Sequence, residues 1–380
     1  MFKLFFSLIL FSVSHTFAQW SALLPISPAG NGMGGISSSA ISDDPFSTMS
    51  NPAQLGAMSL QNSGAFGYYI PEEKEYYQSA TYSVGMNLQK NNSALPLSIG
   101  LGYLRTDWKI GTVYDEYGNA IQLYEKNRFI SLGVGFDYGI RGGIGLSYIE
   151  QKTRNYFSYS PEIKNQFANN LGIVLEIPVS RFIAKALNTD LSLNEHTEFF
   201  FNATTGYVHQ TVSGINPPLY DDKHTLGLGW EIGLQSAHWK IISFLLIREV
   251  DDFSGQGTYS RDYLDDIKIY NNLILGKQSE DNILRKGWQI NLGEAFHARG
   301  GSFVLWRNTI SSLGVGVQLS GIVKYIEAAE PDIFTDSPSL NFLLHHIDIQ
   351  YNYASFYKSE YEGETSYSGT PFRGISILLK

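Results

Sequence analysis

Apolar residues alternate with small or polar residues over long stretches of this chain. Between Phe129 and Gly139 every second residue is isoleucine, leucine, valine, phenylalanine or tyrosine, and serine, glycine and aspartate lie between them. Residues 225–235, 313–320 and 346–353 repeat this period of two. Because successive side chains of a strand point to opposite faces, each stretch predicts a strand with one apolar face and one small or polar face.

The alternating stretches number fourteen, and most of them are long. Soluble strands average about 5–6 residues, whereas a tilted membrane-spanning strand needs about 9–11. An even number of strands is typical of single-chain bacterial barrels. The predicted strands cover residues 61–70, 76–89, 95–107, 123–138, 141–156, 167–180, 195–211, 223–236, 238–250, 286–298, 301–309, 312–325, 341–355 and 371–379.

The composition favours a membrane barrel over a soluble β-sandwich. Only 17% of the residues are charged, against about 25% in soluble domains, and the chain has 24 tyrosines, 23 phenylalanines and 37 glycines. After residue 18 no apolar run approaches the length of a membrane-spanning helix. We therefore predict an all-β fold, a transmembrane antiparallel β-barrel of about 14 strands with a small N-terminal plug. A secreted sandwich or propeller is the alternative.

The first eighteen residues have the pattern of a cleaved signal peptide. Lys3 precedes a ten-residue apolar stretch, and Ala18 and Thr16 place small residues where a signal peptidase cuts. Ten apolar residues are too few for a membrane helix, which needs about 20. The predicted division is a signal peptide over 1–18, a plug segment over 19–60 and an outer-membrane barrel of a Gram-negative-type bacterium over 61–380.

Strand parity assigns the connections to the two sides of the membrane. If both termini are periplasmic, the connections after even strands are periplasmic, and tight turns are predicted at Gly139-Ile140, Ala237 and Arg299-Gly300. Two connections on that side, near 181–194 and 326–340, are longer. The first is either a short periplasmic helix or a packed turn, because four apolar residues have helical spacing. These residues are Phe182, Ile183, Ala186 and Leu187.

The largest connection, residues 251–284, is predicted to be extracellular. It carries seven acidic and three basic residues, a net charge of −4. Leu264, Ile267 and Ile274 lie near helical spacing with Tyr270 alongside, so a short amphipathic helix can form. This helix is either a lid or docking element over the barrel mouth or a helix packed on neighbouring loops.

Residues 19–60 lack strand alternation and are rich in glycine and serine. The Asn51-Pro52 pair can cap a short helix, with the asparagine side chain accepting from free N–H groups and proline at the first helical position. Because this segment precedes the first strand, it is positioned to enter the lumen.

Three motifs of this segment resemble the N-terminal signature of FadL-type outer-membrane proteins, and most closely that of the PorV/PorQ-like branch. They are Gly32-Met33-Gly34-Gly35, Asp43-Asp44-Pro45 and Asn51-Pro52-Ala53-Gln54-Leu55-Gly56. The stretch Lys286-Gly287-Trp288-Gln289 with Arg299-Gly300-Gly301 resembles a late hairpin of that branch.

The resemblance implies a 14-stranded barrel with an N-terminal plug, and it leaves two functions open. The motif order favours a part in type IX protein secretion, with exported proteins or machinery subunits as partners besides outer-membrane lipid. The alternative is a FadL-type channel for hydrophobic small molecules. The implied plug residues are Gly34, Gly35, Asp43, Asp44, Pro45, Asn51, Pro52 and Ala53.

No sequence motif indicates an enzyme, a cofactor or a metal. Residues 30–35 match G-x-G-x-x-G but lack the preceding strand and following helix of a dinucleotide site, so a tight turn explains them. His345 and His346 point to opposite faces of a strand and cannot bind one metal together. The absence of cysteine excludes disulfides, and a net charge of −9 argues against a nucleic-acid partner.

Overall fold

The computed structural model describes most of the chain after residue 26. The described residues are 27–36, 38–42, 44–57, 64–69, 76–87, 97–114, 119–157, 160–194, 196–214, 222–236, 239–254, 267–278, 282–305, 308–330, 337–338, 341–342, 346–357 and 371–379. The predicted signal peptide and the predicted turn at Ala237 lie outside them. No helix among the described residues is long and apolar enough to cross a membrane, a finding that concerns helices alone.

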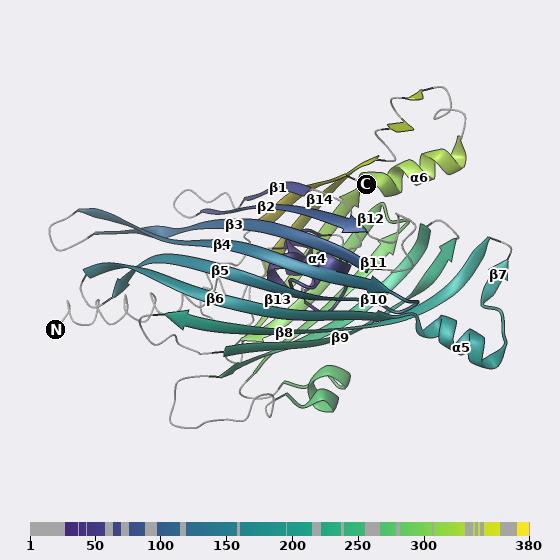
Figure 1. Cartoon of the computed structure of the whole chain (residues 1–380), viewed down its shortest axis with the longest axis horizontal. Coiled ribbons are helices and arrows are strands. Elements are labelled where there is room, and N and C mark those ends of the chain that lie inside the picture. Colours follow the sequence, from purple (N-terminus) through teal and green to yellow (C-terminus); the bar gives the residue numbers. More distant parts are fainter. Residues whose placement is uncertain are drawn as a thin grey trace.

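Long antiparallel strands form one closed barrel (Figure 1). The strands are β1 (Gly64–Tyr69), β2 (Tyr76–Asn87), β3 (Leu97–Tyr114), β4 (Ala120–Asp137), β5 (Arg141–Phe157), β6 (Ser160–Ile177), β7 (Ser192–Asn194), β8 (Thr197–Gly214), β9 (Asp222–Ser236), β10 (Trp239–Ser254), β11 (Asn282–Leu292), β12 (Phe296–Leu305), β13 (Asn308–Gln318), β14 (Ile347–Tyr357) and β15 (Pro371–Leu379). β1 pairs with β15 and β6 with β8, while β7 only flanks β8. Fourteen strands of the described chain therefore close the ring, as the alternation predicts.

The two faces of the barrel wall differ in exposure. Along β4, Ile130, Leu132 and Val134 point outward with exposed fractions of 62%, 44% and 43%, whereas the residues between them are buried. Large exposed apolar side chains occur in the same way on β2–β6 and on β9–β15. An apolar outer band is what a barrel needs in order to lie in lipid. The fold is therefore a transmembrane antiparallel β-barrel, as predicted.

Two of the three predicted tight turns fall on described residues, and one of them is wrong. Tyr138 N–H donates to the Ile140 carbonyl, which confirms the turn at 139–140. The predicted turn at Arg299-Gly300 lies inside β12, and the β11–β12 hairpin turns at 293–295 instead. Glycine at 300 serves packing rather than turning, because a Cβ there would lie 2.4 Å from the Trp288 ring.

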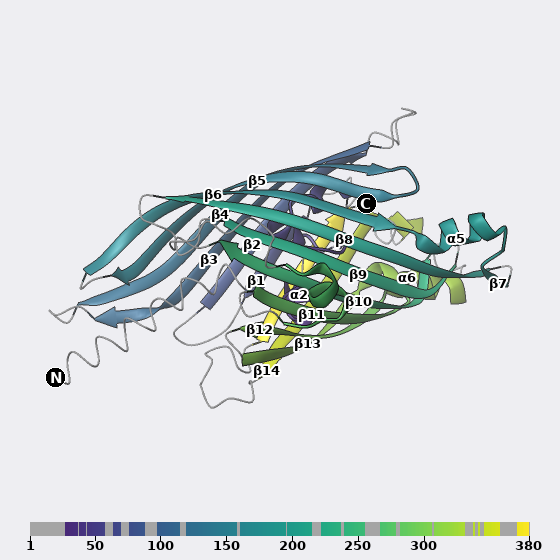
Figure 2. The ribbon, with the colours of Figure 1, turned by 90° about the horizontal axis from the view of Figure 1, so that it is seen from below.

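Two helices lie at the end of the barrel that strand parity assigns to the periplasm (Figures 1 and 2). Of the two alternatives for the connection after β6, a short helix or a packed turn, the structure shows the helix, α5 (Val179–Leu187). The helix α6 (Leu319–Ala329) replaces the end of the strand predicted over 312–325. The sequence misleads here because its apolar residues fit helical spacing as well as alternation. They are Leu319, Ile322, Val323 and Ile326.

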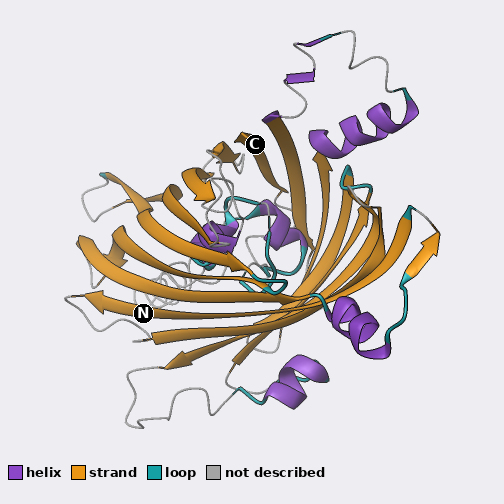
Figure 3. Cartoon of the chain, turned by 45° about the vertical axis from the view of Figure 1, so that its right-hand side comes forward, coloured by secondary structure: helices purple, strands orange, loops and turns teal. Residues whose placement is uncertain are grey.

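The N-terminal part of the described chain lies inside the ring of strands (Figure 3). We call residues 27–57, without 37 and 43, the inner segment; it contains α2 (Pro28–Gly32), α3 (Ser47–Ser50) and α4 (Gln54–Ala57). α2 contacts β12–β15 and α4 contacts β2–β5. The inner segment therefore crosses the lumen from one wall to another, and most of its side chains are buried.

Candidate functional site

A belt of glycines on the inner wall faces the inner segment. A Cβ built on any of them would lie less than 3.0 Å from an atom of the inner segment, closer than real Cβ contacts. The wall carries no side chain at these twelve positions because the inner segment occupies that space, so the lumen is filled there. The belt glycines are Gly100, Gly133, Gly135, Gly143, Gly145, Gly172, Gly206, Gly227, Gly287, Gly301, Gly314 and Gly374.

The glycine pair of the first motif is required by its backbone and by its surroundings. Gly34 and Gly35 have φ values of +76° and +82°, a region that favours glycine. Gly34 N–H donates to Ser312 Oγ at 2.9 Å. The neighbouring Met33 lies against Gly287 and Gly301 of the β11–β12 hairpin. The N-terminal and hairpin motifs that carry the family resemblance therefore meet in space.

Asn51 joins the inner segment to the barrel wall. Its Oδ1 accepts from Ala53 N–H at 3.0 Å, as predicted, but Pro52 lies in the turn before α4 rather than at its first position, because the helix begins at Gln54. Its Nδ2 donates to the carbonyls of Ser38, at 2.7 Å, and Ile173 of β6, at 3.0 Å. Gly172 permits this approach, because a Cβ there would lie 2.1 Å from Asn51 Oδ1.

The proline and alanine of the same motif pack on glycines of β5. A Cβ at Gly145 would lie 2.3 Å from the Pro52 carbonyl carbon, and one at Gly143 would lie 2.5 Å from the Ala53 oxygen. Both motif residues are buried. The Asn-Pro-Ala motif is thus fitted to the wall by residues of two neighbouring strands.

Asp44 is a buried acid within the inner segment. Ser27 Oγ donates to its Oδ2 at 2.5 Å, and Phe46 N–H donates to its Oδ1 at 3.1 Å. Burial raises the pKa of Asp44, and these two hydrogen bonds and the Arg299 guanidinium oppose that rise. The adjacent Pro45 is buried, and Asp43 lies outside the described residues.

Glu249 of β10 is the strongest polar anchor that sequence reasoning missed. Its Oε1 accepts from Ser38 N–H at 2.8 Å, and from the N–H and hydroxyl of Ser39, both at 2.7 Å. The side chain is almost fully buried. In the sequence, alternation places Glu249 on the small-residue face of a strand. It does not distinguish Glu249 from other acids on such faces.

On the side of the belt that strand parity assigns to the cell exterior, many inward-facing residues are large and apolar, whereas small or polar ones are predicted. Phe356 packs edge to face against Phe303 and Phe372, with ring centroids 5.9 and 5.1 Å apart. We call the buried inward-facing apolar residues of this side the apolar lining. It comprises Leu104, Trp108, Ile121, Leu123, Phe129, Ile149, Phe303, Ile310, Phe356 and Phe372.

Two polar clusters interrupt the apolar lining. Asn127 Nδ2 donates to Glu125 Oε1 at 2.8 Å. The Arg285 guanidinium donates to Asp251 Oδ2 at 2.9 Å, and Lys223 Nζ lies 3.4 Å from the same oxygen. These charges are buried together with their partners, as buried charges generally are.

On the periplasmic side of the belt, the inner wall is a hydrogen-bonded polar network. Lys240 Nζ lies 2.7 Å from Glu231 Oε2, and Ser243 Oγ donates to Glu231 Oε1 at 2.7 Å. Asn291 links Ser243 to the His297 ring, at 2.8 and 2.7 Å. Four further hydrogen-bonded pairs extend the network. These are Arg299 with Gln289 and Asn352, and Asp348 with Gln318 and Ser320.

The predicted helix of the large extracellular connection lies along the outer wall. A short π-helix, η2 (Ile269–Ile274), packs on β10 and β11, where Ile267 and Leu273 join a buried cluster with Val250 and Leu284. Figure 3 shows it outside the ring of strands, rather than across the barrel mouth or on neighbouring loops.

The face that this segment buries differs from the predicted one. Tyr270 and Ile274 are 66% and 40% exposed, because the wider π-helical turn changes the spacing of buried residues. Leu264 lies outside the described residues. The lid or docking role stays a prediction.

One cluster of metal-binding residue types occurs among the described residues, at the outer face near the extracellular end. His209, Asp222 and His224 place potential ligand atoms within 4.8 Å of one another. The two imidazole rings are stacked nearly parallel, 4.4 Å apart. Lone pairs in parallel planes cannot both point at one ion about 2.0–2.1 Å away, so this arrangement does not form a metal site without ring rotation.

No protein-family model matches the chain, and neither does any curated protein. The chain is similar to the solved CymD monoaromatic hydrocarbon channel, with 12% identity, a TM-score of 0.40, and 94% of this chain and 97% of that chain covered. The Pseudomonas putida toluene transporter TodX is 9% identical with a TM-score of 0.39, and the match covers 94% of this chain and 97% of that chain. A Pseudomonas aeruginosa FadL homologue is 8% identical with a TM-score of 0.34, and the match covers 93% of this chain and 97% of that chain. Likenesses this distant identify neither a family nor a function.

Proposed function

We propose that this chain is a non-enzymatic outer-membrane channel that passes small hydrophobic molecules and is closed by the inner segment. The observation that carries the proposal is the apolar lining on the extracellular side of the belt. A water-filled porin has a polar lumen, whereas an inner wall of phenylalanine, tryptophan, leucine and isoleucine favours apolar solutes. The resemblance of the N-terminal motifs to FadL-type proteins supports the same function.

The inner segment acts in this proposal as the plug, which the sequence predicts within residues 19–60. Its backbone lies against glycines on ten strands, so a solute cannot pass the belt while the plug is seated. Passage requires the plug to shift or the solute to leave through the wall above it. Side chains of the wall and of Asn51 hold the plug by separate polar contacts along its length, those of Glu249, Ser312 and Ser98 among them, so a shift of one part breaks only the hydrogen bonds of that part.

Type IX secretion, which the motif order favours, stays a prediction as a second function. Within the described residues, the wall and the inner segment offer no surface whose chemistry is specific to an exported protein. Exposed Tyr270 and Ile274 on η2 are the residues that would serve as a docking surface. Co-purification of exported proteins, lost in a Tyr270→Ser/Ile274→Ser variant, would favour secretion.

The transport proposal is tested by solute flux into vesicles that contain the purified protein. We expect flux of apolar compounds of one-ring size or of long-chain amphiphiles above the level of empty vesicles, and no flux of a sugar of similar mass. Trp108→Gln should reduce apolar flux because it places an amide in the lining. Leu132→Gln, on the outer face of β4, is the matched control. Sugar flux without apolar flux would overturn the proposal.

A further inference from the structure

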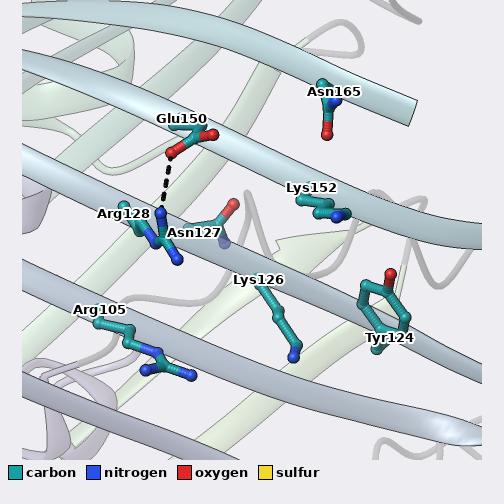
Figure 4. A pocket seen from close by; sticks show the side chains of 8 residues that line it. All are labelled: Arg105, Tyr124, Lys126, Asn127, Arg128, Glu150, Lys152 and Asn165. Carbon is teal, nitrogen blue, oxygen red and sulfur yellow. Dashed lines mark ion pairs between the residues drawn. The ribbon is translucent and has the colours of Figure 1, made fainter. Parts of the chain in front are cut away.

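Basic side chains gather on the outer wall of β3, β4 and β5 (Figure 4). We define the outer basic patch as Arg105, Lys126, Arg128, Glu150 and Lys152, which line an open pocket of about 280 Å³. Four positive charges against Glu150 and the neighbouring Asp107 leave this surface with a net charge of +2 in a chain whose total is −9. The patch therefore stands out against the electrostatics of the whole protein.

The strand register places like charges opposite one another. Arg105 faces Arg128, and Lys126 faces Lys152, on the outer faces of neighbouring strands. Like charges directly opposite destabilise a sheet. Asp107 lies 2.8 Å from Arg105, and Glu150 lies 3.5 Å from Arg128.

Lys126 also faces Asp107 across β3 and β4, but Asp107 forms its ion pair with Arg105, and Lys152 faces Lys126 and Asn165. Neither has an ion pair within the described part of the chain, and Lys126 only lies 5.1 Å above the Tyr124 ring. An anion bound at this surface would offset the positive charge of the two lysines.

The patch begins where the apolar outer band ends. On the same outer face, the next row towards the middle of the membrane consists of Tyr103, Ile130 and Tyr148, which are 43%, 62% and 47% exposed. Tyrosines at this level are typical of the aromatic girdle of such barrels. From the exposed Tyr138 at the opposite end, Arg128 is ten residues away, roughly 33 Å along the strand. At a tilt of about 40° this is about 25 Å along the membrane normal, the height of the apolar band of such barrels.

The position of the turns assigns the patch to the outer leaflet. The connections at the opposite end of the wall are short, as at 138–140 and 293–295, and short turns are periplasmic in these barrels. The patch therefore lies at the level of the outer-leaflet headgroups.

We propose that the outer basic patch binds a phosphate group of an anionic glycolipid headgroup in the outer leaflet. Lys126 and Lys152 contribute two ammonium groups from facing positions of β4 and β5, and the Arg128 guanidinium adds paired N–H donors suited to phosphate oxygens. Basic clusters at the membrane surface attract anionic headgroups in this way. The binding is independent of what passes through the lumen.

The experiment measures lipid retained by the full-length protein in phosphatidylcholine nanodiscs containing diphosphoryl lipid A, by mass spectrometry after purification. We expect Lys126→Gln/Lys152→Gln to weaken lipid A binding by about thirtyfold, and Lys126→Arg/Lys152→Arg to retain it. Lys286→Gln/Arg373→Gln, which neutralises exposed cations on β11 and β15, is the matched control and should retain binding. Heat-modifiability on gels shows that each variant has folded.

Two further arms separate the sources of phosphate. Dephosphorylated lipid A should bind like phosphatidylcholine, because the acyl chains alone do not engage the lysines. Inorganic phosphate should compete only weakly. Equal binding by the wild type and the Lys126→Gln/Lys152→Gln variant, equal loss in the control variant, or inorganic phosphate binding as tight as lipid A would each overturn the proposal.

Discussion

The two sides of the glycine belt stabilise the barrel lumen by different means. On the extracellular side, buried phenylalanine, leucine and isoleucine side chains gain from packing that has little directional demand. On the periplasmic side, each buried charge or amide depends on a partner at hydrogen-bonding distance, because an unpaired polar group in a low dielectric is costly. Stability on the first side should therefore fall most when a substitution removes side-chain volume. Stability on the second side should fall most when a substitution removes a hydrogen-bond or ion-pair partner.

The largest effect is expected from Phe356→Ala in the apolar lining. Phe356 is 1% exposed and contacts two other phenylalanine rings, so truncation leaves a cavity and should lower the free energy of unfolding by about 3–5 kcal/mol. Denaturant titration in detergent measures this change. Leu313→Ala, at an outward position that is 48% exposed, is the control and should cost less. Equal losses at both positions would contradict a packed lining.

On the polar side, Glu231→Leu should cost about 2–3 kcal/mol. It removes the partner of Lys240 and the acceptor of Ser243, and the cost is moderated because the Lys240 side chain is 34% exposed. Adding Lys240→Met should recover part of the loss, because no unpaired charge then remains. The same denaturant titration applies. Failure of the second substitution to recover any stability would show that this side behaves like the apolar one.

The sequence predicts the barrel well because the outer face differs from the inner face over most of the wall. Alternation predicts the number of strands and assigns outward residues such as Ile130 correctly, although it misplaces the bounds of β11, β12 and β13. It fails to predict the apolar lining, because period two distinguishes the faces only where one of them is polar. Leu104 and Trp108, for example, lie on the inner face of a strand whose outer face also carries Leu101 and Tyr103.

Glycine has two uses in this chain that the sequence alone does not separate. Gly139 turns the chain, with φ of +81° and open space around its Cα. Gly300, Gly301 and Gly133 instead make room for a ring or for the inner segment, in the middle of straight strands. Only the packing of a distant segment distinguishes these cases, which is why the turn at 299–300 is predicted wrongly and the belt is not predicted.

At the boundary between the two sides, Asn51→Ala should weaken the docking of the inner segment by about 2 kcal/mol. The change removes the cap on Ala53 N–H and the hydrogen bonds to the Ser38 and Ile173 carbonyls. Hydrogen exchange of the inner-segment amides in nanodiscs measures the opening. Asn169→Ala, an exposed position on β6, is the control and should leave that exchange unchanged. Unchanged exchange in Asn51→Ala would show that belt packing alone holds the segment.

The smallest effect is expected from Glu249→Gln, which tests whether charge or shape holds the inner segment at the belt. The amide oxygen of glutamine can still accept from Ser38 and Ser39, but without the charge these bonds weaken, at a cost of about 1 kcal/mol. Exchange of the amides near residue 39 should then rise about fivefold, while the apolar lining and the polar network keep their stability. Glu249→Ala, which leaves three donors without their acceptor, should open the segment further. Glu150→Gln on the outer wall should have no effect on this exchange. If glutamine and alanine at 249 open the segment equally, its charge is what matters; if neither opens it, the two sides of the belt are separated by packing alone.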